Sequence, residues 1–244
     1  TLIENISAYL SGRLGKEAAK QRVSIETRRE PRVFGGGINF FHPENWYSSH
    51  AFIRYCLKVS GLHGRAQQNA RNIQLIENII QLPALPRSFN HFKILHLSDL
   101  HLDMDSITTA NLIKCISSLH YDVCVLTGDY RAKTFGSIDA TLDAMQDLFK
   151  VLRGPVYAVL GNHDSISMVP GMEAMGFRVL LNESIPVRKN ASAIYMAGID
   201  DAHYFRMEDF NKTVSEIPQN ALSILLSHTP EVYAQAAEHG FAVM

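Results

Sequence analysis

Beyond its N-terminal third, the chain alternates short apolar runs with longer segments of helical periodicity, and this alternation constrains the fold most strongly. Strands are expected at residues 93–97, 122–126 and 156–160. Helices are expected between them, at residues 106–119 and 138–152. Strands that alternate with helices of about 10–15 residues are typical of βαβ units in a parallel sheet. The pattern therefore predicts an α/β fold.

Three shorter apolar segments follow, at residues 178–181, 194–198 and 223–226, and they could build a second sheet. Thr229 is a typical helix N-cap, and a proline follows it at the first helical position. Gly240 is a plausible stop for that helix. The last four residues resemble the start of a further strand. We therefore expect a second sheet and a closing helix.

The charge of the chain divides it into two parts. The first 90 residues contain 12 Lys and Arg against 6 Asp and Glu, whereas the remainder contains 11 against 18. The proline-containing segment 82–86 has the composition of a stiff connector. Apolar residues at helical spacing predict helices in the basic part, including one from Gly64 to Ile80 that ends before Pro83. We predict a basic, mostly helical N-terminal extension over residues 1–90 and an α/β domain over residues 91–244.

The composition is that of a soluble globular protein, with 46% apolar and 19% charged residues. The cysteines Cys56, Cys115 and Cys124 are odd in number and show no Cys-x-x-Cys spacing. They indicate structural thiols in a reducing compartment. No run approaches the roughly 18 apolar residues that a membrane-spanning helix needs, and no secretory pattern is present. We expect a cytoplasmic protein.

Polar motifs stand directly after several of the expected strands. In chain order they are Asp99-Leu100-His101, Gly128-Asp129, Gly161-Asn162-His163-Asp164 and Ser227-His228. In an open α/β sheet, ligands bind beyond the carboxyl ends of the strands, where these motifs would meet. In an extended segment, Asp99 and His101 would point to the same side, because they are two residues apart. The motifs are therefore expected to form one site.

The residue types in these motifs are those of a metal site. Carboxylate oxygen, imidazole nitrogen and amide oxygen together suit divalent Mn, Fe, Zn, Co or Mg. A carboxylate such as Asp129 can bridge two ions, which then lower the pKa of a bridging water and clamp both oxygens of an in-line displacement at phosphorus. His163, next to Asn162, would face the leaving group as a general acid or charge stabiliser.

These four motifs, in this order, resemble those of the calcineurin-like metallophosphoesterase family, over roughly residues 91–244. The resemblance implies an α/β sandwich of two mixed sheets with helices outside. The resemblance also implies that His163 is the catalytic histidine. It implies that Asp99 and His101 bind a first metal ion and that Asn162 and His228 bind a second. Asp129 would bridge the two ions.

The residues around three of the motifs are similar in detail to one branch of this family, the membrane-associated bacterial branch. The segments that carry this similarity are Ile94-Leu95-His96-Leu97-Ser98-Asp99-Leu100-His101, Leu126-Thr127-Gly128-Asp129-Tyr130 and Leu226-Ser227-His228-Thr229-Pro230. The branch includes phosphodiesterases and UDP-diacylglucosamine pyrophosphate hydrolases of lipid A synthesis. The similarity therefore implies a lipid-linked substrate.

The sequence departs from the family pattern in two places. Relatives that are serine/threonine protein phosphatases carry an aspartate three residues after the bridging one, and Ala132 stands here instead. This argues against a protein phosphatase. The family also closes its site with a Gly-His-x-His segment, which this chain lacks. Because the chain begins at Thr1 and stops at Met244, we expect a fragment of a longer protein, truncated at the C-terminus and impaired in metal binding and activity.

Several polar residues allow more than one interpretation. Asp164 could cap or hydrogen-bond its loop, or it could act in catalysis. Arg131 could hold a substrate phosphate bidentately, or it could be a solvated loop arginine. Asp200-Asp201 is expected to serve turn chemistry. Four further histidines are expected to be structural: His91, His96, His120 and His203.

The predicted activity is hydrolysis of a phosphodiester or pyrophosphate bond by a hydroxide that bridges two metal ions, with a lipid-linked substrate as one option. A phosphomonoesterase or nucleotidase with the same centre is one alternative, and a non-catalytic scaffold with the same fold is another. The basic N-terminal extension could contact the cytoplasmic face of a membrane, or it could be a solvated helix face. Nucleic acid is not expected as a partner, because the basic residues are not interleaved with a stacking platform.

Overall fold

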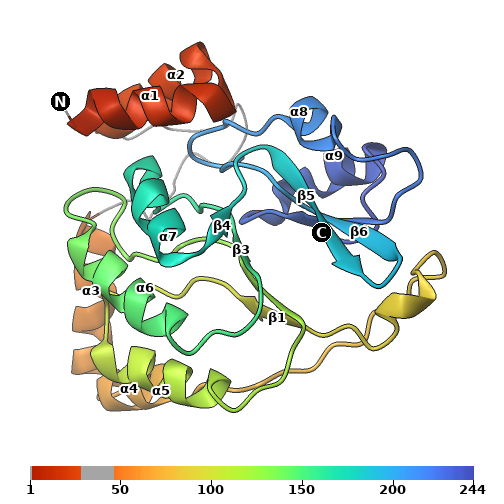
Figure 1. Cartoon of the computed structure of the whole chain (residues 1–244). Coiled ribbons are helices and arrows are strands. Elements are labelled where there is room, and N and C mark those ends of the chain that lie inside the picture. The colour runs from red at the N-terminus through yellow and green to blue at the C-terminus, as the bar shows by residue number, and fades with distance from the viewer. Residues whose placement is uncertain (1, 29–46) are drawn as a thin grey trace.

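Figure 1 shows the computed structural model of the chain, which describes residues 2–28 and 47–244. Side chains are described for residues 8–27 and 52–244. The α-helices of the described part are α1 (Leu2–Leu14), α2 (Lys16–Arg28), α3 (Tyr47–Val59), α4 (His63–Arg71), α5 (Ser106–Ile116), α6 (Asp139–Phe149), α7 (Val169–Met175), α8 (Phe210–Val214) and α9 (Tyr233–Glu238). The strands are β1 (Ile94–Leu97), β2 (Val123–Leu126), β3 (Val156–Ala158), β4 (Arg178–Val179), β5 (Glu183–Lys189), β6 (Ser192–Gly198) and β7 (Ser223–Leu226). Short 3-10 helices lie at Arg87–Phe89, Ile166–Met168 and Pro230–Val232.

The first sheet contains four parallel strands in the order β1-β2-β3-β4. Leu126 of β2 lies opposite Leu97 on one side and Ala158 on the other. This confirms the predicted parallel βαβ arrangement. The segment at 178–181 was expected in the second sheet, and this was wrong, because β4 pairs in parallel with β3. α7 is the crossover that returns the chain to the same sheet.

The second sheet has the order β5-β6-β7 and is mixed. β5 and β6 form an antiparallel hairpin, and β7 is parallel to β6. β5 was not predicted: it contains Pro186, and most of its side chains are half-buried, so it shows no apolar alternation. A proline is tolerated there because β5 is an edge strand. At the other edge Val243 pairs with Ile224, so the last residues do continue the sheet as predicted.

The two sheets pack face to face because side chains alternate in direction along each strand. In β2, Val123 and Val125 lie in the apolar core between the sheets, together with Met196 of β6. Their neighbours Cys124 and Leu126 lie in the core on the opposite face of the first sheet. The fold is therefore an α/β sandwich of two sheets flanked by helices, as predicted, although the first sheet is parallel rather than mixed.

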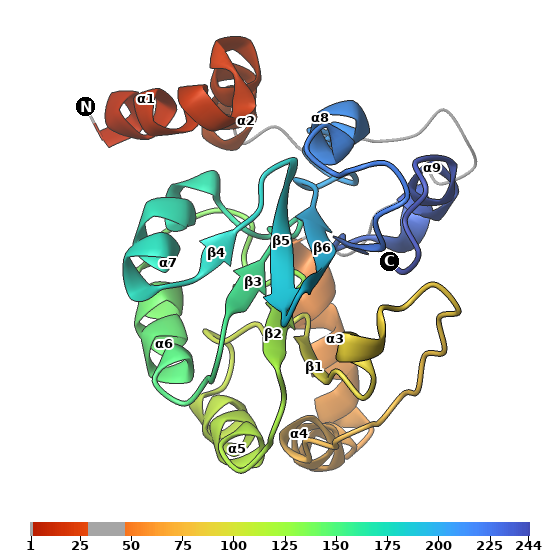
Figure 2. The same ribbon diagram turned by 45° about the vertical axis from the view of Figure 1, so that its right-hand side comes forward.

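Helices cover both outer faces of the sandwich (Figure 2). α5, α6 and α7 contribute Ile116, Met145 and Met172 to the core on the outer face of the first sheet. α8 and α9 contribute Phe210 and Ala236 to the core on the outer face of the second sheet. Because β1, β2 and β3 are parallel neighbours, their carboxyl ends share one edge of the sheet. The loops that follow these strands can therefore meet there.

The N-terminal helices α1 and α2 lie against the α/β domain (Figure 1). Leu10 and Leu14 of α1 are buried in the apolar core that covers the outer face of the first sheet. Arg13 forms ion pairs with Glu173, at 2.7 Å, and with Glu183. These contacts join the basic part of the chain to the acidic part. The division into domains at residues 83–90 stays a prediction.

The helix expected from Gly64 to Ile80 is shorter than predicted, because α4 ends at Arg71. The following residues, 72–82, have no regular secondary structure. Ile76 and Ile79 are 74% and 89% exposed. Helices of this length depend mainly on the tertiary packing of an apolar face. These side chains lack such packing, and apolar spacing alone did not extend the helix.

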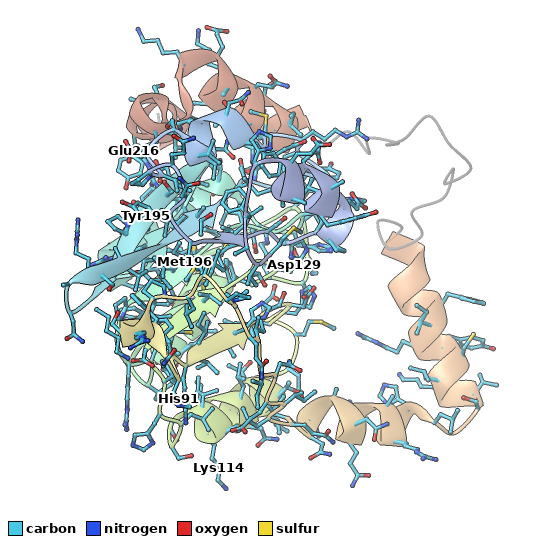
Figure 3. All side chains as sticks on the ribbon, turned by 90° about the vertical axis from the view of Figure 1, so that its right-hand side faces the viewer. His91, Lys114, Asp129, Tyr195, Met196 and Glu216 are labelled. Carbon is cyan, nitrogen blue, oxygen red and sulfur yellow. The ribbon has the colours of Figure 1, made fainter. Side chains whose placement is uncertain are left out.

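α3 projects from the body of the molecule and packs on α4 (Figure 3). Four large apolar side chains on it are exposed: Phe52, Ile53, Tyr55 and Val59. Within residues 2–28 and 47–244, no helix combines the length and the apolar character needed to cross a membrane.

Candidate metal centre

The predicted polar motifs meet at one edge of the sandwich. Asp99 and His101 follow β1, and Asp129 follows β2. Asn162 follows β3 of the first sheet, whereas His228 follows β7 of the second. Asp129 lies near the middle of the molecule in Figure 3 and is 4% exposed. The fold thus collects residues from both sheets around one buried carboxylate.

Asp99, His101 and Asp129 form a group that could hold one metal ion. One ligand atom from each lies within 4.8 Å of the other two. All three residues have left-handed backbones, with φ of 53°, 39° and 56° respectively. Outside glycine, such strained conformations cost about 1–3 kcal/mol each, and they cluster at functional sites. The expectation of an extended segment from Asp99 to His101 was wrong, since left-handed turns bring these donors together instead.

His228, Asn162 and Asp129 form a second group of donors. His228 Nε2 lies 2.9 Å from Asn162 Oδ1 and 3.4 Å from Asp129 Oδ2. Asp129 therefore belongs to both groups. Imidazole, amide and carboxylate are ligands that suit divalent Mn, Fe, Zn or Mg. The donor types in both groups fit a divalent ion.

Hydrogen bonds orient both histidines so that Nε2 is the atom available to a metal ion. His101 Nδ1 lies 2.9 Å from the carbonyl oxygen of Arg131, and His228 Nδ1 lies 2.8 Å from that of Thr127. A carbonyl oxygen can only accept, so each Nδ1 carries a proton. Metal-binding histidines are commonly fixed in this way. These two partners could not be predicted from the sequence, because a main-chain carbonyl has no residue signature.

His163 lies beside the two donor groups. Its backbone N–H donates to Asp129 Oδ1 at 2.9 Å, and its Nε2 lies 3.9 Å from Asp129 Oδ2. Its ring meets the ring of His101 edge-on, with centroids 5.7 Å apart. Its Nδ1 lies 3.0 Å from Thr134 Oγ1. Thr134 was not predicted from the sequence. The one signal for it was the position two residues earlier, Ala132, where protein-phosphatase relatives carry an aspartate.

Asp164 serves its loop as a hydrogen-bond partner. Its fully buried carboxylate accepts the backbone N–H groups of Asp129 at 2.7 Å, Tyr130 at 2.9 Å and Gly161 at 2.8 Å. Burial and the nearby charge of Asp129 raise the pKa of Asp164 to about 7, although the three N–H donors act against this shift. Of the two interpretations from the sequence, the structure supports the loop partner.

Two glycines allow the loops after β2 and β3 to touch. Gly128 has a φ of +96°, and a Cβ on it would lie 2.5 Å from the backbone nitrogen of Gly161. A Cβ on Gly161 would overlap Oδ1 of Asp129. Neither position has room for a side chain. The motifs Gly128-Asp129 and Gly161-Asn162 therefore contain glycine for a steric reason.

Arg131 is buried, with 2% of its surface exposed. Of the two interpretations from the sequence, a solvated loop arginine was therefore wrong. Its Nη2 lies 3.4 Å from the carbonyl oxygen of Gly136, and its Nε has no hydrogen-bond partner among the described residues. Burial lowers the pKa of Arg131, and the charges of Asp164, Asp103 and Glu26 act against this shift. The role of Arg131 in holding a substrate phosphate stays a prediction.

The charges at the centre of the site stabilise one another. Burial would lower the pKa of His228, but the hydrogen bond and charge of Asp129 outweigh it and raise this pKa to about 9. Conversely, burial would raise the pKa of Asp129, but His228 and His163 hold it below its ordinary value. His228 is therefore protonated at neutral pH without metal, and its Nε2–H points at the oxygens of Asn162 and Asp129. Without metal, the positive charge of the His228 ring itself therefore compensates the carboxylate of Asp129.

The other polar residues have local roles. His96 Nε2 lies 2.8 Å from Thr127 Oγ1, and burial lowers the pKa of His96. Asp201 accepts the backbone N–H groups of Tyr204 and Phe205, both at 2.6 Å, which is the turn chemistry expected for it. Asp200 differs from the expectation, because it forms an ion pair with an arginine of α2.

The fold and the donor set define a class of protein, a metal-binding α/β sandwich with its polar site at the ends of the strands. The family model of the calcineurin-like phosphoesterases matches residues 92–239, more than half of the chain. The chain belongs to the calcineurin-like phosphoesterase family. This confirms the family predicted from the four motifs, and the membrane-associated branch stays a prediction.

Relatives with similar sequences include two proteins of Bacillus subtilis (strain 168). The uncharacterized metallophosphoesterase YkoQ is 30% identical over 179 residues, which cover 69% of this chain and 64% of YkoQ. The uncharacterized metallophosphoesterase YkuE is 28% identical over 198 residues, which cover 75% of this chain and 67% of YkuE. A solved structure, the phosphopantetheinyl hydrolase PptH of Mycobacterium tuberculosis, matches 59% of this chain and 71% of its own with a TM-score of 0.38 and 13% identity.

Proposed function

We propose that the protein hydrolyses phosphoester bonds with two divalent metal ions. The observation that carries this proposal is the position of Asp129, whose buried carboxylate belongs to both donor groups. A carboxylate has two oxygens and can bind an ion with each. Membership of the calcineurin-like phosphoesterase family supports the same chemistry. Mn, Fe, Zn and Mg all suit the donors, and manganese is the first ion to test.

Each donor group would hold one ion. Asp99 and His101 would bind the first ion, Asn162 and His228 the second, and Asp129 both. When bound, two such ions lower the pKa of a coordinated water and stabilise the oxygens of a phosphate that undergoes in-line displacement. The protein holds these donors in place through its strained loops and through the hydrogen bonds of their backbone amides.

His163 would assist the leaving group. Its Nδ1 contacts Thr134 and its backbone N–H is bonded to Asp129, so the ring is held with Nε2 as the atom that can donate a proton to a departing oxygen. A general acid matters most for a poor leaving group. H163N should therefore slow the hydrolysis of an alkyl ester far more than that of a nitrophenyl ester. An equal loss on both esters would assign His163 to charge stabilisation instead.

The preferred substrate class is a phosphodiester or a pyrophosphate. The motifs similar to the membrane-associated bacterial branch support it, as does Ala132 in place of the aspartate of protein phosphatases. A phosphomonoesterase or nucleotidase would use the same centre. The ratio of kcat/KM for bis-p-nitrophenyl phosphate to that for p-nitrophenyl phosphate separates the two activities. A ratio above one supports the diesterase, and a ratio below one supports the monoesterase.

Replacement of the bridging carboxylate tests the whole proposal. D129N keeps the shape of the side chain but removes the charge that both groups share. In the full-length protein, we expect it to abolish hydrolysis of bis-p-nitrophenyl phosphate with Mn²⁺ and to weaken metal binding. D143N is the matched control, because Asp143 is exposed on α6 and lies outside the donor groups. Undiminished turnover by D129N would overturn the assignment.

A non-catalytic scaffold is the alternative outside enzyme chemistry. The donors that are present argue against it, because a decayed site would have lost members such as Asp99 or Asn162. Metal analysis of the full-length protein after reconstitution decides between the two functions. A stoichiometry close to two ions per chain supports the enzyme, and a value near zero supports the scaffold.

We further propose that the protein contacts a membrane surface through α3 and α4. Residues 47–76 contain the basic residues Arg54, Lys58, Arg65 and Arg71 and no acidic residue. On α3 the exposed large side chains include Phe52 and Tyr55, at 66% and 65% exposure. Exposed aromatic residues beside basic ones are typical of helices that lie on anionic lipid. A lipid-linked substrate fits a protein placed in this way.

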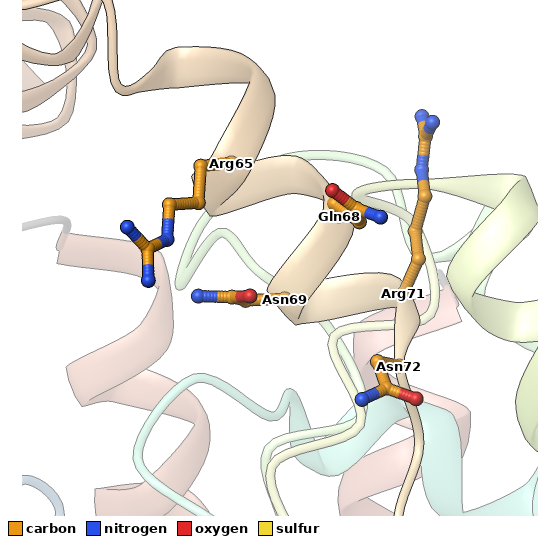
Figure 4. Close-up of a pocket in the computed structure, with 5 residues that line it drawn as sticks. All are labelled: Arg65, Gln68, Asn69, Arg71 and Asn72. Carbon is orange, nitrogen blue, oxygen red and sulfur yellow. The ribbon is translucent and has the colours of Figure 1, made fainter.

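A polar depression on α4 supports the same proposal (Figure 4). It has a volume of about 810 Å³ and is lined by five polar side chains: Arg65, Gln68, Asn69, Arg71 and Asn72. The guanidinium of Arg65 and the three amides suit an anionic headgroup, whereas the guanidinium of Arg71 is engaged by Asp105. The metal donors do not line this depression. Arg71 also pairs with Asp105 at 2.9 Å, which ties α4 to the loop after β1.

Vesicle flotation tests the membrane contact. The protein should float with vesicles that contain anionic lipid and should remain below neutral ones. The double variant F52S/Y55S should lose this binding. Y233S is the control for removal of an exposed aromatic side chain, because Tyr233 is 71% exposed on α9. Flotation of F52S/Y55S at the level of the parent would contradict the proposed surface.

A further inference from the structure

α2 carries an arginine with no exposed surface. The Nε of Arg22 lies 3.2 Å from Asp200 Oδ2, and both side chains of this ion pair are 0% exposed. Its Nη2 donates to the carbonyl oxygen of Asp164 at 3.2 Å, and its Nη1 donates to Glu26. Its Cζ lies 3.1 Å from the centroid of the Phe205 ring. Every nitrogen of the guanidinium therefore has an acceptor, and its face has an aromatic partner.

A buried cation is strongly disfavoured unless its partners are placed to match it. The partners of Arg22 come from three separate parts of the chain, namely α2 itself, the loop after β3 and the loop after β6. Their meeting point is thus a specific junction between α2 and the α/β domain. A solvated helix face, which was one interpretation of the basic residues, does not describe Arg22.

Glu26, one turn further along α2, extends this junction to the next two residues of the loop. Its Oε2 accepts the hydroxyl proton of Ser165 at 2.6 Å, and its Oε1 accepts the backbone N–H of Ile166 at 2.6 Å. Arg22 holds the carbonyl of Asp164, so α2 contacts three consecutive residues. Those residues directly follow the Asn162-His163 pair.

A single residue, Asp164, connects this junction to the residue of the bridging carboxylate, Asp129. Asp164, whose carbonyl accepts from Arg22, accepts the backbone N–H of Asp129 with its own carboxylate. It also accepts the N–H of Gly161, at the start of the loop that carries Asn162. A continuous path of hydrogen bonds thus runs from Arg22 through Asp164 to the donor groups.

We propose that α2 is part of the catalytic unit and that Arg22 and Glu26 are positioning residues, which fix the loop of residues 161–166 so that Asn162 and His163 face Asp129. This inference rests on the proposed metal centre. It assigns a role in the site to a helix that lies more than 60 residues before the first family motif.

Four variants test this inference. R22M leaves Asp200 buried and unpaired, so it should lower the melting temperature. R22M/D200N removes both charges and should restore much of the melting temperature, but it cannot restore the bond to the carbonyl of Asp164. We expect kcat of the double variant on bis-p-nitrophenyl phosphate to fall about 10- to 100-fold, with KM changed much less. R22K keeps a charge for Asp200, so its melting temperature should lie above that of R22M, but its kcat should still fall, because an ammonium cannot bond three separate acceptors with the geometry of a guanidinium. K20M is the control, because Lys20 is exposed on the same helix and pairs only at the surface with Glu17.

The visible spectrum of bound Co²⁺ gives a readout that is independent of turnover. The spectrum of R22M/D200N should shift, because the loop that carries Asn162 is no longer fixed, whereas that of K20M should match the parent. If the double variant does not fold, E26Q, which weakens the same loop contact at a partly exposed side chain, should show a smaller shift and a smaller fall in kcat.

The outcomes separate the two proposals. A parent protein that binds Co²⁺ but shows no turnover would refute the proposed activity and leave the spectral test of the junction intact. A folded R22M/D200N, or E26Q, with the kcat and the Co²⁺ spectrum of the parent would overturn the role of α2.

Discussion

The carboxylate of Asp164 accepts the backbone N–H of Asp129 at 2.7 Å, and both side chains are buried. Asp164 does not belong to either donor group. Its role is to hold the main chain in place, because its two carboxylate oxygens accept the backbone N–H groups that follow β2 and β3. The loops that hold the donors are therefore joined by one acidic side chain.

This relationship predicts a structural penalty for the loss of one acceptor. In D164N an amide NH₂ group would replace an oxygen and face a backbone N–H. We expect the free energy of unfolding to fall by about 1–3 kcal/mol, because a buried donor loses its partner. Urea denaturation and Mn²⁺ titration check this, with exposed D143N as control. Parental stability together with parental Mn²⁺ affinity would show that Asp164 does not hold the loops.

The contact between Gly128 and Gly161 predicts that a single methyl group disrupts the site. G161A would place a Cβ into Asp129 Oδ1, which must then move. We expect a loss of about 1–3 kcal/mol in stability, typical of overpacking, and a loss of metal binding. G64A is the matched control, because a Cβ there meets nothing within 4 Å in a helix. G64A should be neutral or slightly stabilising. A G161A variant that behaves in the same way would contradict the close approach of Gly161 to Asp129.

Metal binding should release protons below about pH 9. The pKa of His228 in the metal-free protein is raised to about 9 from an ordinary value of 6.5. Protonated His228 therefore stabilises the metal-free fold fully below pH 6.5, and this stability is lost as the pH rises through 9. A metal ion needs the neutral ring, so its apparent affinity should rise with pH up to about 9.

Isothermal titration of Mn²⁺ at pH 7.5, in two buffers with different ionisation enthalpies, measures this proton release. H228Q should abolish most of it. H120Q, at an exposed histidine away from the donors, should leave it unchanged. Equal heats in the two buffers for the parent protein would contradict the prediction.

The cysteines should differ sharply in reactivity. Burial raises the pKa of the Cys124 thiol to about 12 from an ordinary value of 9.0, whereas Cys56 is exposed on α3. At pH 8, iodoacetamide should modify Cys56 in the folded protein and reach Cys124 only after denaturation. Because unfolding frees this thiol to ionise, stability should fall as the pH rises above 9. Mass spectrometry of the alkylated peptides checks the order of reaction.

The fold could be predicted from the sequence wherever periodicity reflects burial. α5 begins at Ser106 as predicted from the helical periodicity, and in the structure Asp105 caps it. β5 escaped prediction because a half-buried edge strand lacks an alternating pattern. The helix predicted around Ile76 is absent for the opposite reason, since helical spacing was present without a surface to pack against.

The metal donors could be predicted because each stands at the end of a strand and carries recognisable chemistry. The residues that support them could not. Thr134 is one hydroxyl in a loop, and the carbonyl of Thr127 has no signature at all. Arg22 lies 142 positions before Asp164, and nothing in an amphipathic basic helix distinguishes a buried arginine from a solvated one. Such contacts arise only from tertiary structure.

The burial of Arg22 has a consequence for synthesis. Its ion-pair partner Asp200 lies 178 positions later in the chain. At roughly 5–20 residues per second, a ribosome needs on the order of 10–35 s to deliver that partner. During this interval Arg22 stays hydrated, and the buried junction between α2 and the α/β domain cannot form. α2 is therefore made well before the contacts that bury its arginine can form.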